Sequence, residues 1–165
     1  YGRVVGLGMN ARELEANERL SEFVQADLNT NPVLPFDDAS FDNVLCVVSI
    51  DYLTQPQEVV SEMHRVLRPG GRAMLSFSNR CFPSKVIGMW LSADDMKRQE
   101  IVASYFQFAP EGGWTNIGTE TLPKAKAAKV PKQGGGLFGG LLDLNAMASF
   151  LAPSDPMYMV SATKA

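Results

Sequence analysis

Polar side chains that could bind or activate a small molecule follow two apolar runs of the sequence. Asp51 and Tyr52 follow the first run, and Asn79 and Arg80 follow the second. A carboxylate can act as a general base, a tyrosine can stack or hydrogen-bond, and an arginine can hold a carboxylate or phosphate. These four residues are the candidate catalytic or substrate-facing groups. Each pair could equally be an ordinary loop start or helix cap.

A second group of residues has the spacing of a nucleotide-binding loop. Gly6, Gly8 and Ala11 match G-x-G-x-x-A after a short apolar strand, and Asp27 follows as a later acid. In dinucleotide-binding proteins such a loop approaches the phosphates while the acid binds the ribose. This interpretation predicts an NAD(P)-binding oxidoreductase. A simpler alternative is that these glycines only permit a tight strand-to-helix turn.

The other reactive side chains give no catalytic or metal signature. His64 is the one histidine and lies in mid-helix beside an apolar stripe, which disfavours a serine–histidine triad. Cys81 has no neighbour that would lower its pKa, so we expect an ordinary thiol. The carboxylates of Asp37, Asp38 and Asp42 lack the spacing of metal ligands and predict a solvated turn. We therefore predict no metal site.

A β–α–β unit between Phe41 and Asn79 must position the candidate residues. Its first strand contains five successive apolar residues, 44–48, which predicts a central parallel strand buried on both faces. Thr54 and Gln57 have the spacing of a capping box at the start of the helix. Helical spacing then gives one apolar stripe, made of Val59, Val60, Met63, Val66 and Leu67.

The helix is expected to stop at Pro69 and the Gly70-Gly71 pair, and a second strand to run from Arg72 to Ser78. Two parallel strands joined in this way make a right-handed crossover. Further strands are predicted at 3–7, 22–29, 114–122 and 157–163, and two helices that pack on the sheet at 84–106, broken near Ala93-Asp94.

The segment LPFDDASFDNVLCVVSIDYL, followed by EMHRVLRPGGRAMLSFSN, resembles the second half of a class I S-adenosylmethionine-dependent methyltransferase of the small-molecule (methyltransferase type 11-like) subgroup. The LPF turn, the acid-rich loop, the FD strand opening and the helix ending in RVLRPGG carry this resemblance, which covers residues 3–109 and, weakly, the last ten residues. It implies an α/β fold with a three-layer Rossmann-like sheet. That sheet would be mostly parallel, with an antiparallel C-terminal edge strand.

The resemblance also implies S-adenosylmethionine as the cofactor. Asp27 would accept a hydrogen bond from the adenine amino group, and the backbone at Leu28 would frame the ring, although a plain turn at Asp27 stays open. Gly8 stands where the family carries a ribose-binding acid, so Asn10 or Glu13 would take that role. The cofactor-binding residues that follow from the resemblance are Asp27, Leu28, Asn10 and Ser49.

The sequence opens at Tyr1, just before a strand. Methyltransferases of this class hold the methionine part of the cofactor with a glycine-rich loop after their first strand. That strand and loop would precede Tyr1, so we expect residues 1–165 to be one incomplete, N-terminally truncated domain that binds the cofactor poorly. The expected function is methyl transfer to a small molecule, since no N-P-P-[FYW] signature of nucleic-acid enzymes occurs. The other open alternative is a non-catalytic, methyltransferase-like interaction module.

Composition limits the partners of the chain. With 165 residues, 45% of them hydrophobic, it can bury one core, and its net charge of −3 argues against a nucleic-acid partner. No apolar run approaches the roughly 20 residues that span a bilayer, and we expect no membrane partner. Two cysteines give no disulfide framework, which favours a reducing compartment, cytoplasmic or organellar. Residues 110–155 read as a partly flexible Lys/Ala/Gly-rich insertion, with a short helix at 141–151.

Overall fold

The computed structural model describes residues 2–109, 113–122 and 156–165. The described residues divide into two compact units, residues 2–27 and residues 28–109 with 113–122 and 156–165. We describe each unit by itself, and the single-domain organisation stays a prediction. Most of the predicted insertion, including the helix expected at 141–151, lies outside the described residues.

The first unit contains two short parallel strands and one short helix. The elements are β1 (Val5–Gly8), α1 (Ala11–Glu15) and β2 (Glu22–Gln25). Strand β1 pairs with β2 in parallel. A Cβ placed on Gly6 would come within 2.4 Å of Leu20 Cδ1, so the glycine lets the leucine pack directly against the strand. Gly6 thus has a packing role.

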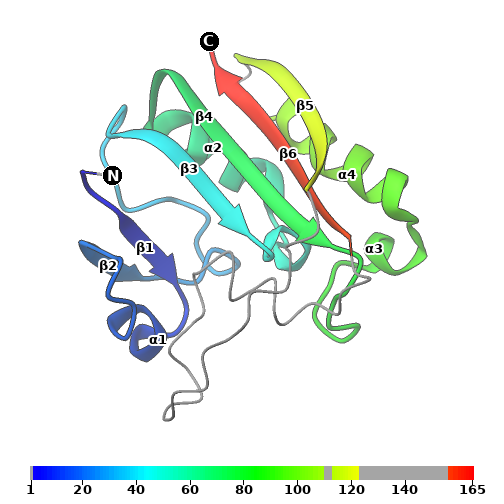
Figure 1. Ribbon diagram of the computed structural model, residues 1–165, viewed down its shortest axis with the longest axis horizontal. Helices are drawn as coiled ribbons and strands as arrows, with labels where there is room; N and C mark the ends of the chain where they lie inside the picture. The colour runs from blue at the N-terminus through cyan, green and yellow to red at the C-terminus, as the bar shows by residue number, and fades with distance from the viewer. Residues whose placement is uncertain (1, 110–112, 123–155) are drawn as a thin grey trace. The chain divides into compact units, whose positions relative to one another are not determined.

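The second unit is built on a four-stranded sheet in the order β3-β4-β6-β5 (Figure 1). Its strands are β3 (Phe41–Val47), β4 (Leu67–Ser78), β5 (Trp114–Leu122) and β6 (Met157–Lys164). Strands β3 and β4 are parallel, as predicted, and β6 is antiparallel to both β4 and β5. The structure confirms the predicted α/β class.

Two predictions about strand position were wrong. Strand β6 is not an edge strand, because β5 pairs with its far side and occupies the edge. Strand β3 is not central in the described sheet, since β4 is its one hydrogen-bonded neighbour there. Leu45 on β3 is 56% exposed, so the apolar run is not buried on both faces.

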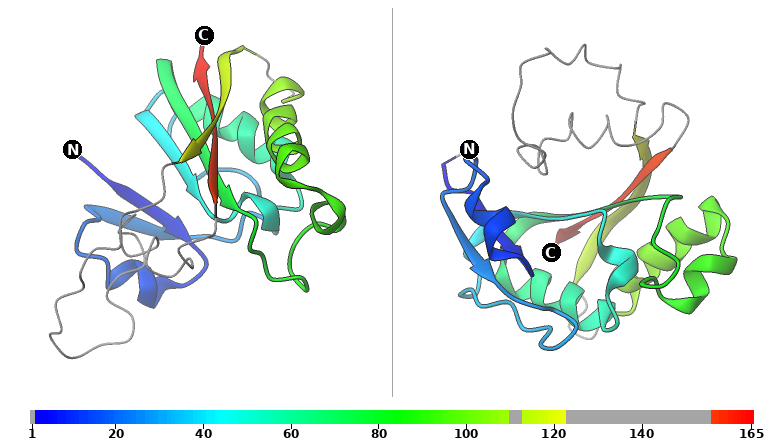
Figure 2. Two further views of the ribbon diagram at one scale, coloured as in Figure 1. Left: turned by 45° about the vertical axis from the view of Figure 1, so that its right-hand side comes forward. Right: turned by 90° about the horizontal axis from the view of Figure 1, so that it is seen from below.

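One face of the four-stranded sheet is covered by the helices of this unit (Figure 2). The helical elements are η1 (Ile50–Tyr52), α2 (Pro56–Val66), α3 (Gly88–Ser92) and α4 (Asp95–Gln107). The alternate residues Ala73, Leu75 and Phe77 of β4 are fully buried, and the Phe77 ring meets the Trp90 ring of α3 edge to face, with centroids 5.2 Å apart. The core of the unit therefore lies between β4 and the helices.

Helix α2 buries the predicted apolar stripe, but its ends differ from the prediction. Its N-cap is Gln55, with no side-chain cap hydrogen bond, and Pro56 sets the first turn. Thr54 instead donates its backbone N–H and its hydroxyl to Asn29 Oδ1. The helix ends at Val66, before Pro69, and Gly70 adopts φ +79° inside a bulge of β4.

Candidate functional site

The carboxyl ends of β3 and β4 lie at the same end of the sheet, because the strands are parallel and Val47 pairs with Ser76. The candidate pairs Asp51–Tyr52 and Asn79–Arg80 follow these ends directly. Ligands of open α/β sheets bind outside the carboxyl ends of the strands. The second unit thus brings the predicted acceptor-side residues to the end of the sheet where a ligand is expected.

The backbone is strained where β3 ends. Val48 has φ +48°, in the left-handed region that β-branched residues rarely adopt, while its N–H donates to Ser76 O at 2.9 Å. This conformation costs about 1–2 kcal/mol. Strain of this kind collects at functional sites, where the surrounding structure holds it in place.

Asp51 is the most unusual polar residue at this end of the sheet. The residue is 2% exposed, and its Oδ1 atom has no hydrogen-bond partner among the described residues. Burial raises the pKa of its carboxyl, while the Arg98 charge and a weaker hydrogen bond with Tyr52 act in the opposite direction. A carboxyl of raised pKa with a vacant oxygen is suited to taking up a proton. Ile87 N–H holds the backbone carbonyl of Asp51 at 3.1 Å.

Tyr52 is half-buried and connects the two strand-end segments. Its hydroxyl oxygen accepts a hydrogen bond from the Phe82 N–H at 3.2 Å, and the two rings lie tilted with centroids 6.4 Å apart. Burial raises the pKa of the Tyr52 hydroxyl, so it stays protonated and able to donate. The two rings offer apolar faces to an aromatic ligand.

The other predicted residues of the second unit are more ordinary. Asn79 and Arg80 are exposed, and the Arg80 N–H donates to Ser78 Oγ in a strand-exit turn. Ser49 is exposed and lies 3.2 Å from the Cys46 Sγ. Burial raises the pKa of Cys46 to about 11, so this thiol is no nucleophile.

Sequence reasoning missed two polar groups that lie on the helix side of the sheet with Asp51. Trp90 of α3 and Tyr105 of α4 are buried, and neither Trp90 Nε1 nor the Tyr105 hydroxyl has a hydrogen-bond partner in the described parts of the chain. Burial and the charge of Asp51 raise the pKa of Tyr105 to about 12. In the sequence both residues belong to apolar helical patterns, which mark them as core and hide their polar atoms.

Asn29 was also missed, although it fixes the loop that carries Asp51. Its side-chain amide donates to Tyr52 O at 3.0 Å, and its Oδ1 accepts from the Thr54 N–H at 2.8 Å. Asn29 thereby ties the segment that begins at half-buried Leu28 to the loop before α2. No local sequence signal identifies this contact, since its partners lie about 25 residues away.

The first unit holds the remaining cofactor-side candidates. Asn10 is the N-cap of α1, accepting from the Arg12 N–H at 3.1 Å and donating to Glu13 Oε1 at 2.7 Å. The two residues expected to bind ribose hydroxyls are therefore engaged with each other. Asp27 lies two residues beyond the end of β2 and is half-buried.

The oxidoreductase alternative finds little support in this unit. A dinucleotide fingerprint requires its glycines on a central strand followed by a full helix. Strand β1 pairs with β2 alone among the described strands, and α1 contains five residues. Gly6 is explained by the close packing of Leu20.

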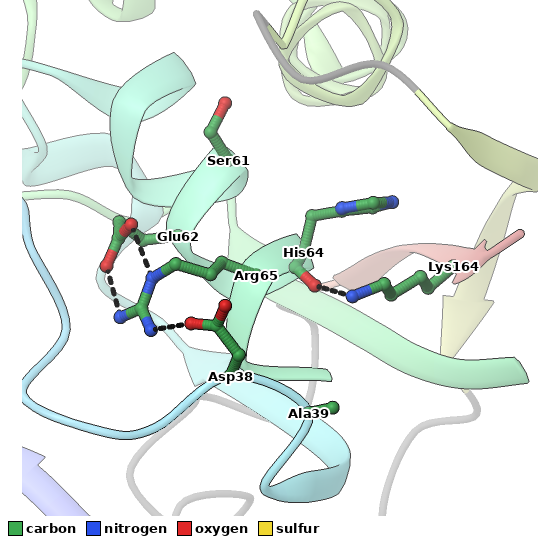
Figure 3. A pocket seen from close by; sticks show the side chains of 7 residues that line it. All are labelled: Asp38, Ala39, Ser61, Glu62, His64, Arg65 and Lys164. Carbon is green, nitrogen blue, oxygen red and sulfur yellow. Dashed lines mark hydrogen bonds and ion pairs between the residues drawn. The ribbon is translucent and has the colours of Figure 1, made fainter. Parts of the chain in front are cut away.

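A cavity of about 360 Å³ lies at the opposite end of β4 (Figure 3). Arg65 donates to Glu62 Oε2 at 2.7 Å and to Asp38 Oδ1 at 2.6 Å, and its guanidinium also binds two backbone carbonyls. Lys164 donates to the carbonyl of His64 at 2.7 Å. Because these charges are paired within the protein, we assign this end a structural role.

Within the described residues, no group of three or more His, Cys, Asp or Glu side chains could hold a metal ion. None of the helices in those same ranges has the length and apolar character needed to cross a bilayer.

The parallel β–α–β unit with an antiparallel strand beside it is the Rossmann-like arrangement of class I S-adenosylmethionine-dependent methyltransferases, which this chain resembles. Residues 2–75 match the family described as Methyltransferase domain.

Curated relatives and solved structures agree with this assignment. A demethylmenaquinone methyltransferase of Clavibacter sepedonicus is 39% identical over 69 residues, which are 42% of this chain and 26% of the relative. The ubiquinone/menaquinone biosynthesis C-methyltransferase UbiE of Hahella chejuensis is 39% identical over 92 residues, 50% of this chain and 36% of the relative. The chain thus spans about a quarter to a third of these relatives.

The solved structures support the fold. A methyltransferase from Aquifex aeolicus superposes with a TM-score of 0.55 at 12% identity, covering 99% of this chain and 69% of the other. One from Mesorhizobium loti gives 0.54 at 14% identity, covering 98% and 80%. Both are described as S-adenosylmethionine-dependent.

Proposed function

We propose that this protein takes part in methyl transfer from S-adenosylmethionine to a small-molecule acceptor. The observation that carries the proposal is the buried carboxyl of Asp51, with a vacant oxygen, at the carboxyl end of β3. Buried polar groups are nearly always hydrogen-bonded, so a buried carboxyl oxygen without a hydrogen bond calls for an explanation. A binding or catalytic role would provide it. The family assignment supplies the reaction class.

The residues of the chain fit the cofactor in part. Asp27 offers a carboxylate for the adenine amino group, and Leu28 offers its backbone, whereas Asn10 is already used as a helix cap. When bound, S-adenosylmethionine supplies an electrophilic methyl group to an acceptor atom that gives up a proton.

Asp51 is proposed to take that proton. Its raised pKa makes the carboxylate a better base than an exposed aspartate, and Ile87 holds its backbone in place. Tyr52 and Phe82 are proposed to orient the acceptor through their ring faces. This arrangement, together with the names of the quinone-biosynthesis relatives, favours an acceptor with an aromatic ring.

The test separates binding from catalysis. Asp51→Asn should lower kcat about 10²- to 10⁴-fold, the usual contribution of a general base, and leave the Kd for S-adenosylmethionine nearly unchanged by calorimetry. Asp27→Ala should instead weaken cofactor binding about tenfold or more, the value of a hydrogen bond to a charged group. Asp37→Ala, in an exposed turn, is the matched control for both. Cofactor binding that is absent from the full-length protein would overturn the proposal and favour a non-catalytic interaction module.

A further inference from the structure

Helix α3 is anchored in its unit through Trp90. This residue is fully buried, and its ring meets the Phe77 ring of β4 edge to face. Its neighbours Met89 and Leu91 are 57% and 53% exposed. The expectation that the helices at 84–106 pack on the sheet was therefore wrong for these two side chains. The contacts that hold Trp90 thus decide where α3 and the residues just before it lie.

A series of hydrogen bonds connects Asp51 to α4 through this segment. The Ile87 N–H donates to the carbonyl of Asp51 at 3.1 Å, and the Trp90 N–H donates to the carbonyl of Ile87 at 3.0 Å. Arg98 of α4 completes the series, because its Nη2 and Nε atoms donate to the carbonyl of Trp90 at 3.3 and 3.4 Å. The same guanidinium lies 5.8 Å from the indole centroid. Arg98 therefore contacts both the carbonyl and the ring of the residue that anchors α3.

The Arg98 side chain is 13% exposed, and its remaining nitrogen is also bound. Nη1 donates to Asp95 Oδ1 at 3.1 Å, and Asp95 Oδ2 accepts from the Tyr158 hydroxyl of β6 at 2.6 Å. The guanidinium can bind the Trp90 carbonyl and the Asp95 carboxylate together, because its donors lie in one rigid plane. Asp95 is 39% exposed, so solvent screens its charge more than that of Arg98. Arg98 is accordingly the charge of this pair that acts on Asp51.

The ionisable side chains that interact with the charge of Asp51 come from β3, from its own turn and from α4. They are Cys46, Tyr52, Arg98 and Tyr105. Burial raises the pKa of Cys46 to about 11, and burial with the Asp51 charge raises the pKa of Tyr105 to about 12. Burial also raises the pKa of Tyr52, so these three groups are uncharged at neutral pH and Arg98 is the charged one of the four. Burial raises the pKa of Asp51 itself, and the charge of Arg98 opposes that rise.

We propose that Arg98 is a positioning residue for Asp51, acting through the Trp90 segment that holds the Asp51 backbone and through its own positive charge. A buried carboxyl without a nearby cation retains its proton and cannot accept another one. Arg98 therefore keeps Asp51 available as a base while α3 keeps it in place. The catalytic meaning rests on the proposed role of Asp51 as proton acceptor. The effect of Arg98 on the ionisation of Asp51 needs neither cofactor nor acceptor, so it can be tested separately.

The test is an NMR titration of the full chain with aspartate labelled at its carboxyl carbon, in which Asp51→Asn identifies the Asp51 signal. Arg98→Met removes the charge and keeps the apolar stem, so the signal of Asp51 should titrate at higher pH than in the parent. Arg98→Lys keeps a charge but not the planar fork, and its titration should lie between those two. The matched control is Tyr158→Phe, which removes the hydrogen bond to Asp95 and leaves Arg98 in place, so Asp51 should titrate as in the parent.

Circular dichroism shows whether each variant is folded. Should Arg98→Met not fold, Arg98→Gln replaces it, because glutamine also lacks the charge but keeps an N–H donor for the Trp90 carbonyl. The proposal is overturned if the uncharged variant leaves the titration of Asp51 unchanged, or if Arg98→Lys or Tyr158→Phe shifts it equally far. A shift in the uncharged variant together with full activity of Asp51→Asn would support the effect of Arg98 and overturn the proposed reaction alone. No shift together with an inactive Asp51→Asn would do the reverse.

Discussion

The two ends of β4 differ in how their buried charged side chains are bound. At the amino end, Arg65 binds Glu62, Asp38 and two backbone carbonyls, and Lys164 binds two further carbonyls. At the carboxyl end, the Oδ1 atom of the Asp51 carboxyl is buried without a hydrogen-bond partner within the described ranges. The first arrangement stabilises the fold, whereas the second costs stability and leaves bonding capacity for a ligand. The charges of the amino end therefore stabilise the fold, and the carboxyl end is where we propose the functional site.

The largest expected effect lies at the amino end. Arg65→Ala should lower the free energy of unfolding by about 2–3 kcal/mol, because it leaves Glu62 and two carbonyls without their partner. The control is Arg68→Ala, which removes an exposed pair with Asp42 and should cost no more than about 0.5 kcal/mol. Urea unfolding of the two variants measures both values. Equal losses would remove the distinction between a network and a surface pair.

Two tyrosines offer a matched pair for the unpaired groups. The Tyr158 hydroxyl donates to Asp95 Oδ2 at 2.6 Å, so Tyr158→Phe should cost about 1.5 kcal/mol. The Tyr105 hydroxyl has no such bond in the described structure, so Tyr105→Phe should change stability by less than about 0.5 kcal/mol or increase it. Thermal unfolding of both variants decides the point. A large loss for Tyr105→Phe would show that its hydroxyl is satisfied in solution.

The strained turn after β3 gives a smaller effect of opposite sign. Val48→Asn should raise stability by about 0.5 kcal/mol, because asparagine tolerates the left-handed region better than valine does. The same change at Val33, which is exposed and has no positive φ, should give no gain. Chemical denaturation measures both. A loss at Val48 would mean that its side chain contributes more than the strain costs.

The carboxyl of Asp51 should make stability depend on pH. Since burial raises its pKa in the folded state, the folded protein binds the proton more tightly than the unfolded chain. The contribution of Asp51 is therefore most favourable below its unfolded pKa and declines as the pH rises through its folded pKa. Asp51→Asn removes this decline, so the variant should gain stability relative to the parent between pH 4 and pH 7. Unfolding curves of the parent and of Asp51→Asn at pH 4 and pH 7 measure this gain. The prediction is contradicted if the variant loses stability relative to the parent as the pH rises.

Local patterns predicted the parts of the fold that depend on periodicity. The apolar stripe of α2, from Val59 to Val66, is buried as its helical spacing indicated, and so is Leu67, which the structure places in β4. The parallel pairing of β3 and β4 followed from the same unit. The predicted break between the two later helices also occurs, at residues 93–94. In each case the prediction depended only on residues that are close together in the sequence.

Contacts between distant segments could not be predicted in this way. Nothing near Asn29 indicates that it binds Thr54, which is why a capping box looked plausible there. Helix α3 is too short for its apolar residues to show which side is inward, so Trp90 and Leu91 looked alike. Trp90 is fully buried and Leu91 is 53% exposed. The catalytic and cofactor roles of the site residues stay predictions.

The position of β6 between β4 and β5 has a consequence for biosynthesis. Neither neighbour can complete its ladder until β6 has left the ribosome, and Lys164 reaches back 100 residues to the carbonyl of His64. Contacts of such high sequence separation slow folding and leave strand edges open in the nascent chain. A stop codon before β6 would therefore release a polypeptide in which β4 and β5 each have an unpaired edge, a form prone to aggregation and degradation.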